Sequence, residues 1–356
     1  MRPTVHRTLA LAGALVVLAG TAAAAQAGPA GRDRGRRYEI GLFGDMPYGD
    51  TGRAQYPNVI AGMNRADLAF SVFDGDIKNG SEPCYADGAA QAPADATHPD
   101  VYRYALNLFD QFRAPVVYVP GDNEWTDCDR PSTQGPTADA VQRLDYVRTV
   151  FASTDRSLGR HTMPLTRQAA PYRENVTWVA GPVTYLGLNV PGSDNDYIPD
   201  GDTKDGPQAE ANAEYAARNT ANLAWIHAGF AAAERRGSRA VMIVLQADMF
   251  GDSPGHPEGT TADPTDHFAD TKAAIAREAA AFGRPVVVVN GDSHYLTIDK
   301  PFTDDAGNTI MNVTRVMTFG SKLNHWVSAT VDPDDPQVFT FHQHVIGANV
   351  PTYTFH

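Results

Sequence analysis

The stretch that decides the fold runs from Val286 to His294 and reads VVVVNGDSH. Four consecutive valines predict a β-strand buried on both faces, as in a parallel sheet that is covered on each side. The Gly291-Asp292 pair follows the strand directly. Glycine lets the backbone turn tightly at this point, so we expect the short Asp292 side chain to point into a cleft beyond the strand.

The same pattern, an apolar run that ends in Gly-Asp, occurs at three other places. The pairs are Gly44-Asp45 after Ile40–Phe43, Gly75-Asp76 after Phe70–Phe73, and Gly121-Asp122 after Val116–Val119. One such aspartate is explained equally well as a helix cap or a turn residue. In an open α/β sheet, however, ligands bind beyond the carboxyl ends of the strands. Carboxylates gathered there repel one another unless a cation neutralises them, so the repeated pattern predicts a metal site.

Strand-like runs alternate with helical stretches, which predicts an α/β fold with mainly parallel strands. Short strands after Tyr295, together with Val183–Asn189, predict a mixed second sheet. We find no internal repeat or strong linker, and therefore expect a single domain over residues 38–356. The expected helices are Arg53–Arg65, Pro99–Phe112, Thr137–Phe151, Pro207–Arg236 and Pro264–Phe282. The other expected strands are Tyr38–Gly44, Leu68–Phe73, Pro115–Pro120, Arg239–Leu245, Pro285–Asn290, Tyr295–Asp299, Val313–Phe319, Val327–Val331 and Gln337–Gln343.

The overall composition is that of a globular protein, with 42% hydrophobic and 20% charged residues among 356. Lys and Arg number 29 against 42 Asp and Glu, which gives a net charge of −13. This acid excess argues against binding to a nucleic-acid backbone, which requires a basic face. The acid excess is compatible with a small phosphorylated substrate that is bound through metal ions.

The N-terminal 27 residues have the pattern of a signal peptide. A basic start is followed by the apolar run Leu9–Ala25, and Ala25-Gln26-Ala27 fits a small-x-small cleavage site. The alternative is a membrane anchor, for which the run is short. We expect cleavage near Ala27, a basic Gly-rich linker over residues 28–37, and a secreted protein without a membrane span after cleavage.

The chain has two cysteines, Cys84 and Cys128, which excludes a four-cysteine zinc site and an all-cysteine iron–sulfur cluster. Export to an oxidising compartment favours a disulfide between them. The alternative is two free thiols.

The Gly-Asp segments, taken in order, resemble the motifs of the calcineurin-like metallophosphoesterase family. Those motifs run D-x-H, G-D, G-N-H-E/D, a single His, and G-H-x-H. The corresponding segments here are Asp45-Met46-Pro47, Gly75-Asp76, Gly121-Asp122-Asn123-Glu124, Gln246-Ala247-Asp248 and Gly291-Asp292-Ser293-His294. The resemblance implies a fold of two packed mixed β-sheets flanked by helices, a four-layer sandwich with its ligands on loops at strand ends.

The resemblance also implies roles for individual residues. Asp45, Asp76 and His294 match metal ligands of the family, with Asp76 as the carboxylate that bridges two metals. Asp122 and Asp292 stand where the family has Asn and His, and both keep an oxygen ligand. Pro47 replaces a ligand histidine and cannot coordinate. The fourth motif offers either Gln246 or Asp248 in place of its histidine.

The third motif lacks the family's histidine that assists the leaving group, because Asn123 stands there. Glu124 is the nearby candidate for a proton donor. Lys78, Asn79 and His325 are candidate substrate contacts, although a solvated loop lysine and an ordinary strand histidine explain Lys78 and His325 as well.

The resemblance implies two divalent metal ions, and the oxygen-rich ligand set favours Mg, Mn, Ca or Fe over Zn. Our first hypothesis is therefore a secreted metal-dependent phosphoesterase that hydrolyses a phosphomonoester or phosphodiester by a metal-bound hydroxide. The alternative is a non-catalytic metal- or ligand-binding module on the same scaffold, suggested by Pro47 and Asn123 where the family has histidine.

Overall fold

The computed structural model describes residues 35–84, 100–130, 139–200, 208–253, 256–257 and 266–352. The predicted signal peptide, most of the predicted linker and the last four residues of the predicted domain lie outside this part of the chain. Within it, no helix is both long and apolar enough to cross a membrane.

The first sheet has five strands in the order β14-β13-β1-β2-β3. The three neighbouring strands β1, β2 and β3 are parallel, whereas β13 pairs antiparallel with β1 and with β14. The strands are β1 Tyr38–Phe43, β2 Leu68–Phe73, β3 Val116–Tyr118, β13 Trp326–Val331 and β14 Phe339–His344.

The second sheet has seven strands in the order β11-β12-β10-β7-β6-β5-β4. Its centre, from β12 to β6, is parallel, and both of its ends are antiparallel. The strands are β4 Thr166–Arg167, β5 Val176–Ala180, β6 Val183–Gly187, β7 Ala240–Val244, β10 Val286–Asn290, β11 Thr297–Asp299 and β12 Val313–Met317. A separate hairpin pairs β8 Asp252–Ser253 with β9 His256–Pro257.

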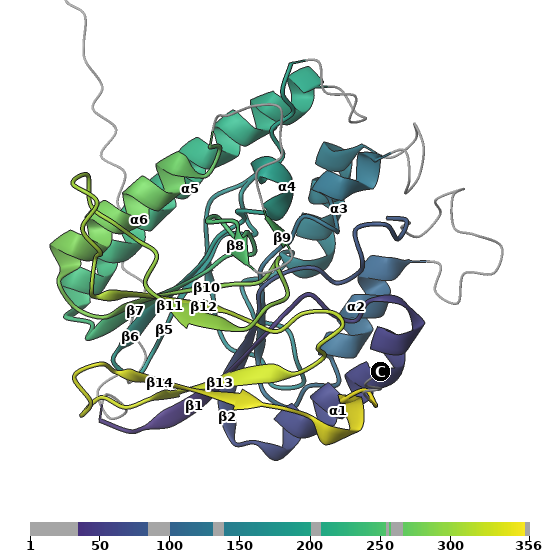
Figure 1. Ribbon diagram of the computed structural model, residues 1–356, viewed down its shortest axis with the longest axis horizontal. Coiled ribbons are helices and arrows are strands. Elements are labelled where there is room, and N and C mark those ends of the chain that lie inside the picture. Colours follow the sequence, from purple (N-terminus) through teal and green to yellow (C-terminus); the bar gives the residue numbers. More distant parts are fainter. Residues whose placement is uncertain are drawn as a thin grey trace, which may run out of the picture.

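Helices cover the outer face of each sheet (Figure 1). The long helix α5 and its neighbour α6 lie against the seven-stranded sheet, whereas α1, α2 and α3 pack beside the five-stranded sheet. The helices are α1 Gly49–Arg65, α2 Val101–Phe109, α3 Ala140–Phe151, α4 Gly192–Asn195, α5 Gln208–Arg236 and α6 Ala269–Phe282, with the 3₁₀ turns η1 Thr126–Asp129 and η2 Gly347–Asn349.

The fold is therefore an α/β sandwich of four layers, as expected, and the valine run shows how the layers form. Val287 and Val289 belong to the core between the two sheets, while Val286 and Val288 face the core under α5 and α6. Successive side chains of a strand point to opposite faces, so a strand that is apolar at every position is buried on both.

The expectation that the strands after Tyr295 join Val183–Asn189 in a mixed second sheet is right for β11 and β12 and wrong for β13 and β14. β11 and β12 extend the seven-stranded sheet, whereas β13 and β14 extend the five-stranded sheet through the pairing of β13 with β1. The apolar pattern locates these strands correctly, but it carries no information about which strand edge each one joins. β4 and β5 were not expected at all.

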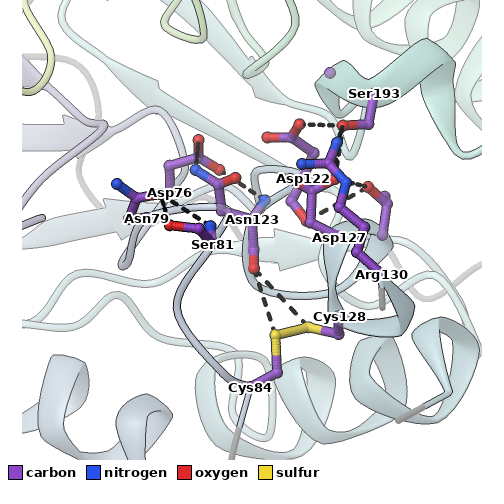
Figure 2. Close-up of polar contacts among 12 residues, drawn as sticks. Asp76, Asn79, Ser81, Cys84, Asp122, Asn123, Asp127, Cys128, Arg130 and Ser193 are labelled. Atoms are coloured by element: carbon purple, nitrogen blue, oxygen red, sulfur yellow. Dashed lines mark hydrogen bonds and ion pairs between the residues drawn. A yellow bond between two sulfur atoms is a disulfide. The ribbon is translucent and has the colours of Figure 1, made fainter. Parts of the chain in front are cut away.

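The disulfide between Cys84 and Cys128 is present, with Cα atoms 5.5 Å apart. It joins the segment after β2 to the turn after β3, and both sulfur atoms lie near the carbonyl oxygen of Asn123, at 3.6 and 3.9 Å (Figure 2). The bond therefore fixes the loop that carries Asp122 and Asn123 against the neighbouring strand end.

Replacing both cysteines by serine is expected to lower the free energy of unfolding by about 2–4 kcal/mol, because the bond restricts the unfolded chain. Urea unfolding of the double variant and the wild type measures the difference. Free thiols titrated in the denatured, unreduced wild type would contradict the assignment.

Candidate metal centre

The four Gly-Asp turns meet at one place, but they come from both sheets. The turns after β1, β2 and β3 belong to the five-stranded sheet, whereas the turn after β10 belongs to the seven-stranded sheet. Ligand atoms of Asp45, Asp76 and His294 all lie within 4.8 Å of one another, a spacing that suits a single metal ion. Asp45 and Asp76 are buried, and 22% of the His294 side chain is exposed.

The motif contains glycine because the loops of the site approach one another too closely for a side chain at these positions. A side chain at Gly121 would collide with the Asp76 carboxylate and its backbone nitrogen, and one at Gly291 would collide with the Asp45 carboxylate. Each of these two glycines thus makes room for the aspartate of another strand end. The Gly-Asp repeat is a packing requirement of the site as well as a turn signal.

The backbone at the centre is strained in the same places. Asp45, Asp76, Asp292 and His294 have φ between +50° and +73°, the left-handed region that non-glycine residues seldom occupy. Aspartate tolerates this region better than most residues do, and such strain is concentrated at functional sites.

Within the described part of the chain, the Asp76 carboxylate accepts four hydrogen bonds. Its Oδ2 accepts from the Tyr48 hydroxyl at 2.8 Å, the Asn123 amide at 2.5 Å and the Gln246 amide at 3.3 Å. Its Oδ1 accepts the backbone N–H of Asn123 at 3.1 Å. Tyr48 is thus a polar partner of the site.

Gln246 and Asp248, which the sequence left as alternatives, have different surroundings. The Gln246 amide nitrogen faces Asp122 at 3.0 Å, beside Asp76. Asp248 instead forms a buried ion pair with Arg315 at 3.0 Å and accepts from Ser293 at 2.8 Å. Gln246 therefore belongs to the carboxylate cluster, and Asp248 supports the loop behind it.

Asp292 and Asp45 are linked through the backbone. The N–H of Asp292 lies 3.1 and 3.2 Å from the two carboxylate oxygens of Asp45, and the Asp292 carboxylate accepts the N–H of Asp248 at 3.0 Å. His294 Nε2 lies 3.4 Å from Asp45 Oδ1.

Asn123 and Glu124, the candidates for assisting the leaving group, differ in placement. The Asn123 amide touches both Asp76 and the Tyr48 hydroxyl. Glu124 is fully buried, and its Oε1 accepts from Gly121 N–H at 2.8 Å, Tyr118 at 2.7 Å and Asp76 N–H at 3.3 Å. Burial raises the pKa of the Glu124 carboxyl, against the effect of these donors.

The three candidate substrate contacts are placed as follows. Lys78 is fully buried and donates to the Asn79 carbonyl at 3.1 Å. The Asn79 side chain accepts from the N–H and hydroxyl of Ser81, which closes a local turn. His325 is buried, packs edge-on against Phe319 and accepts the N–H of Ile346. Among the residues that the structure describes, we find no hydrogen bond from Lys78, Asn79 or His325 to the carboxylate of Asp45 or Asp76.

The buried, closely spaced carboxylates of the centre would be stabilised by a bound cation. Burial raises the pKa of Asp76 well above its usual value, and the nearby Asp122, Glu124, Asp45 and Asp292 raise it further. Behind the site, Asp74 is also buried, and its Oδ1 has no hydrogen-bond partner. Burial opposes protonation of His294, but its contact with Asp45 raises the pKa of the imidazole overall. Two carboxylates and an imidazole at this spacing are a suitable ligand set for a divalent metal.

The turn α4 was not predicted as part of the site. Ser193, Asp194, Asn195 and Asp196 all have φ between +50° and +65°. The Ser193 hydroxyl lies 2.5 Å from Asp122 Oδ2 and 2.7 Å from Asp127 Oδ1 (Figure 2). Asp and Asn make up three of the four residues and tolerate the left-handed region, but they visit it mostly as single residues, so the sequence does not predict four in succession.

Arg218 of α5 holds this turn in place. Its guanidinium is fully buried and donates to the Asn195 side chain at 2.6 Å, the Asn195 carbonyl at 2.9 Å and the Asn189 carbonyl at 3.2 Å. It also pairs with Glu214 at 2.9 Å. In the sequence, the sign of this role is that Arg218 is a charged residue in the middle of an Ala-rich helix.

Arg218→Met is expected to lower the free energy of unfolding by about 3–5 kcal/mol, because it leaves buried acceptors and Glu214 without their cation. Denaturant unfolding of this variant and of Arg235→Met, an exposed position on the same helix, measures the effect. Equal stability of the two variants would contradict the role given to Arg218.

Comparisons with known proteins do not show a family. No family model matches the chain, and no curated protein is similar to it. A solved structure, described only as a crystal structure, aligns with 87% of this chain and 100% of its own at 9% identity and a TM-score of 0.40. A likeness this weak carries no argument about fold or function.

Proposed function

We propose that this protein is a secreted metal-dependent phosphoesterase acting on a small phosphomonoester or phosphodiester. The observation that carries the proposal is the convergence of Asp45, Asp76 and His294 from the ends of three different strands to within 4.8 Å. The order of the Gly-Asp motifs along the chain supports phosphoester chemistry, since it resembles that of the calcineurin-like metallophosphoesterases. The disulfide is compatible with an exported protein.

Asp45, Asp76 and His294 would hold the metal. When bound, a divalent cation supplies Lewis-acid stabilisation of phosphoryl oxygens and lowers the pKa of a water molecule. The Tyr48 hydroxyl and the Asn123 amide orient Asp76 by hydrogen bonds. Both groups are neutral donors, so they fix the carboxylate without cancelling its charge.

Beside these ligands, nearby cations and a hydroxyl group partly offset the negative charge of the other acidic residues. Burial lowers the pKa of the Lys78 ammonium, and the charges of Asp127, Glu124 and Asp76 oppose this shift only in part. Arg130 pairs with Asp127 at 2.6 Å, and Ser193 lies between Asp127 and Asp122. A negative substrate therefore meets a carboxylate cluster whose outer members are partly neutralised.

The test is a panel of phosphoesters, including p-nitrophenyl phosphate and bis-p-nitrophenyl phosphate, assayed with Mn²⁺, with Mg²⁺ and after chelation. The expected result is release that stops on chelation and returns with metal. Hydrolysis in ¹⁸O-labelled water should place the label in the phosphate product, because water attacks phosphorus. Bound metal without turnover across the panel would favour the alternative, a non-catalytic metal-binding module.

A further inference from the structure

The acceptor sites of Asp76 limit how many metals this centre can take. A carboxylate oxygen has two lone pairs, and Oδ2 of Asp76 already receives donors from Tyr48, Asn123 and Gln246. Its Oδ1 receives a single N–H, which leaves one acceptor position. A carboxylate in this state can bind one cation but cannot bridge two.

The Gln246 side chain occupies the position between the two carboxylates that a second cation would have to neutralise. Its amide nitrogen lies 3.3 Å from Asp76 Oδ2 and 3.0 Å from Asp122 Oδ1. An amide NH₂ carries two donor hydrogens, one for each carboxylate. The donor thus makes the contacts that a bridging metal would otherwise make.

The orientation of that amide is fixed from behind. Gln246 Oε1 accepts the backbone N–H of Gly192 at 2.5 Å, so turning the amide over would place its NH₂ against another donor. Gly192 can approach this closely because it has no side chain, and a Cβ there would lie 2.7 Å from Asp292 Oδ1. The remaining oxygen of Asp122 accepts from Ser193.

We infer that the centre binds one divalent metal, on Asp45, Asp76 and His294, and that the Gln246 amide takes the place of a second. This inference rests on the proposed metal site but differs from the two-metal expectation drawn from the sequence. It assigns Gln246 as a positioning residue that donates to Asp76 and Asp122, and not as a metal ligand.

The experiment counts Mn²⁺ per chain by calorimetric titration and by native mass spectrometry of the full chain. The wild type is expected to bind one Mn²⁺. Gln246→Glu has nearly the same shape and keeps an acceptor for Gly192, but it replaces the donor by a negative oxygen. It is expected to bind two Mn²⁺, the second between its new carboxylate and the Asp122 Oδ1 that the amide donor leaves free, and to gain more thermal stability from Mn²⁺ than the wild type does. Gln337→Glu, at an exposed position, is the matched control and should bind one.

The possible outcomes distinguish a failure of the one-metal inference from a failure of the proposed metal site. Two Mn²⁺ on the wild type, or one Mn²⁺ on Gln246→Glu, would overturn the inference and leave the proposed function intact. A Gln246→Glu variant that stays unfolded in the presence of Mn²⁺ would also overturn it, because a second cation should restore its charge balance. No Mn²⁺ on the wild type would overturn the metal site itself.

Discussion

Asp45→Asn is expected to lower metal-dependent phosphoester turnover by about 10²–10³-fold, the loss typical of removing one preorganised charge at a reacting centre. Asp45 is fully buried, and both of its oxygens lie within hydrogen-bond reach of the Asp292 N–H. Asparagine keeps the volume and one acceptor oxygen but removes the negative charge next to His294. The change therefore affects the metal more than it affects the packing.

The measurement compares turnover and Mn²⁺ affinity of Asp45→Asn with those of the wild type at saturating substrate. Asp305→Asn makes the same chemical change at an exposed position and should leave both values unchanged. A folded Asp45→Asn protein with wild-type turnover would remove Asp45 from the site.

Gly121→Ala is expected to weaken Mn²⁺ binding by more than about 10-fold, comparable with losing a partner that orients a metal ligand. The added methyl group would collide with the Asp76 carboxylate and with the Asp76 backbone nitrogen, which cannot move aside as a flexible side chain can. We also expect about 1–3 kcal/mol of destabilisation from overpacking. The Asp76 ligand would move while the rest of the cluster stays in place.

Gly347→Ala provides the control for this substitution. A Cβ at Gly347 meets nothing within 4 Å, so stability should change by no more than about 0.5 kcal/mol and metal affinity should not change. Calorimetric Mn²⁺ titration and urea unfolding of both variants give the two values. Unchanged affinity in a folded Gly121→Ala protein would contradict the close approach of Gly121 to Asp76.

The fold class could be predicted because its signals are local. The Val286–Val289 run, the helical stretches and the Gly-Asp turns each depend on residues that are neighbours in the chain. Strand pairing is not local: the antiparallel pairing of β13 with β1 joins residues nearly 300 positions apart in sequence, such as Tyr38 and Val331. The apolar pattern of β13 suits an inner position in either sheet, so the sequence does not assign it to one.

In the candidate site, too, the local sequence predicts some features, whereas others depend on residues far apart in the chain. Asp45, Asp76 and His294 could be named from the spacing of their motifs, and the structure brings them together. The partners that set their properties could not be named. Ser193 contacts Asp122 from a left-handed turn whose Asn195 is held by Arg218 of the distant helix α5. The direction of the Gln246 amide depends on one backbone N–H of that turn.

The central claim, metal-dependent phosphoester hydrolysis at Asp45, Asp76 and His294, is tested most directly by titrating metal-free protein with Mn²⁺ while phosphate release is followed. We expect release to be absent without metal and to rise with bound Mn²⁺ in the wild type, and to remain near zero throughout the titration of Asp45→Asn. Release that is independent of Mn²⁺, or no release at any Mn²⁺ concentration across the phosphoester panel, would contradict the claim.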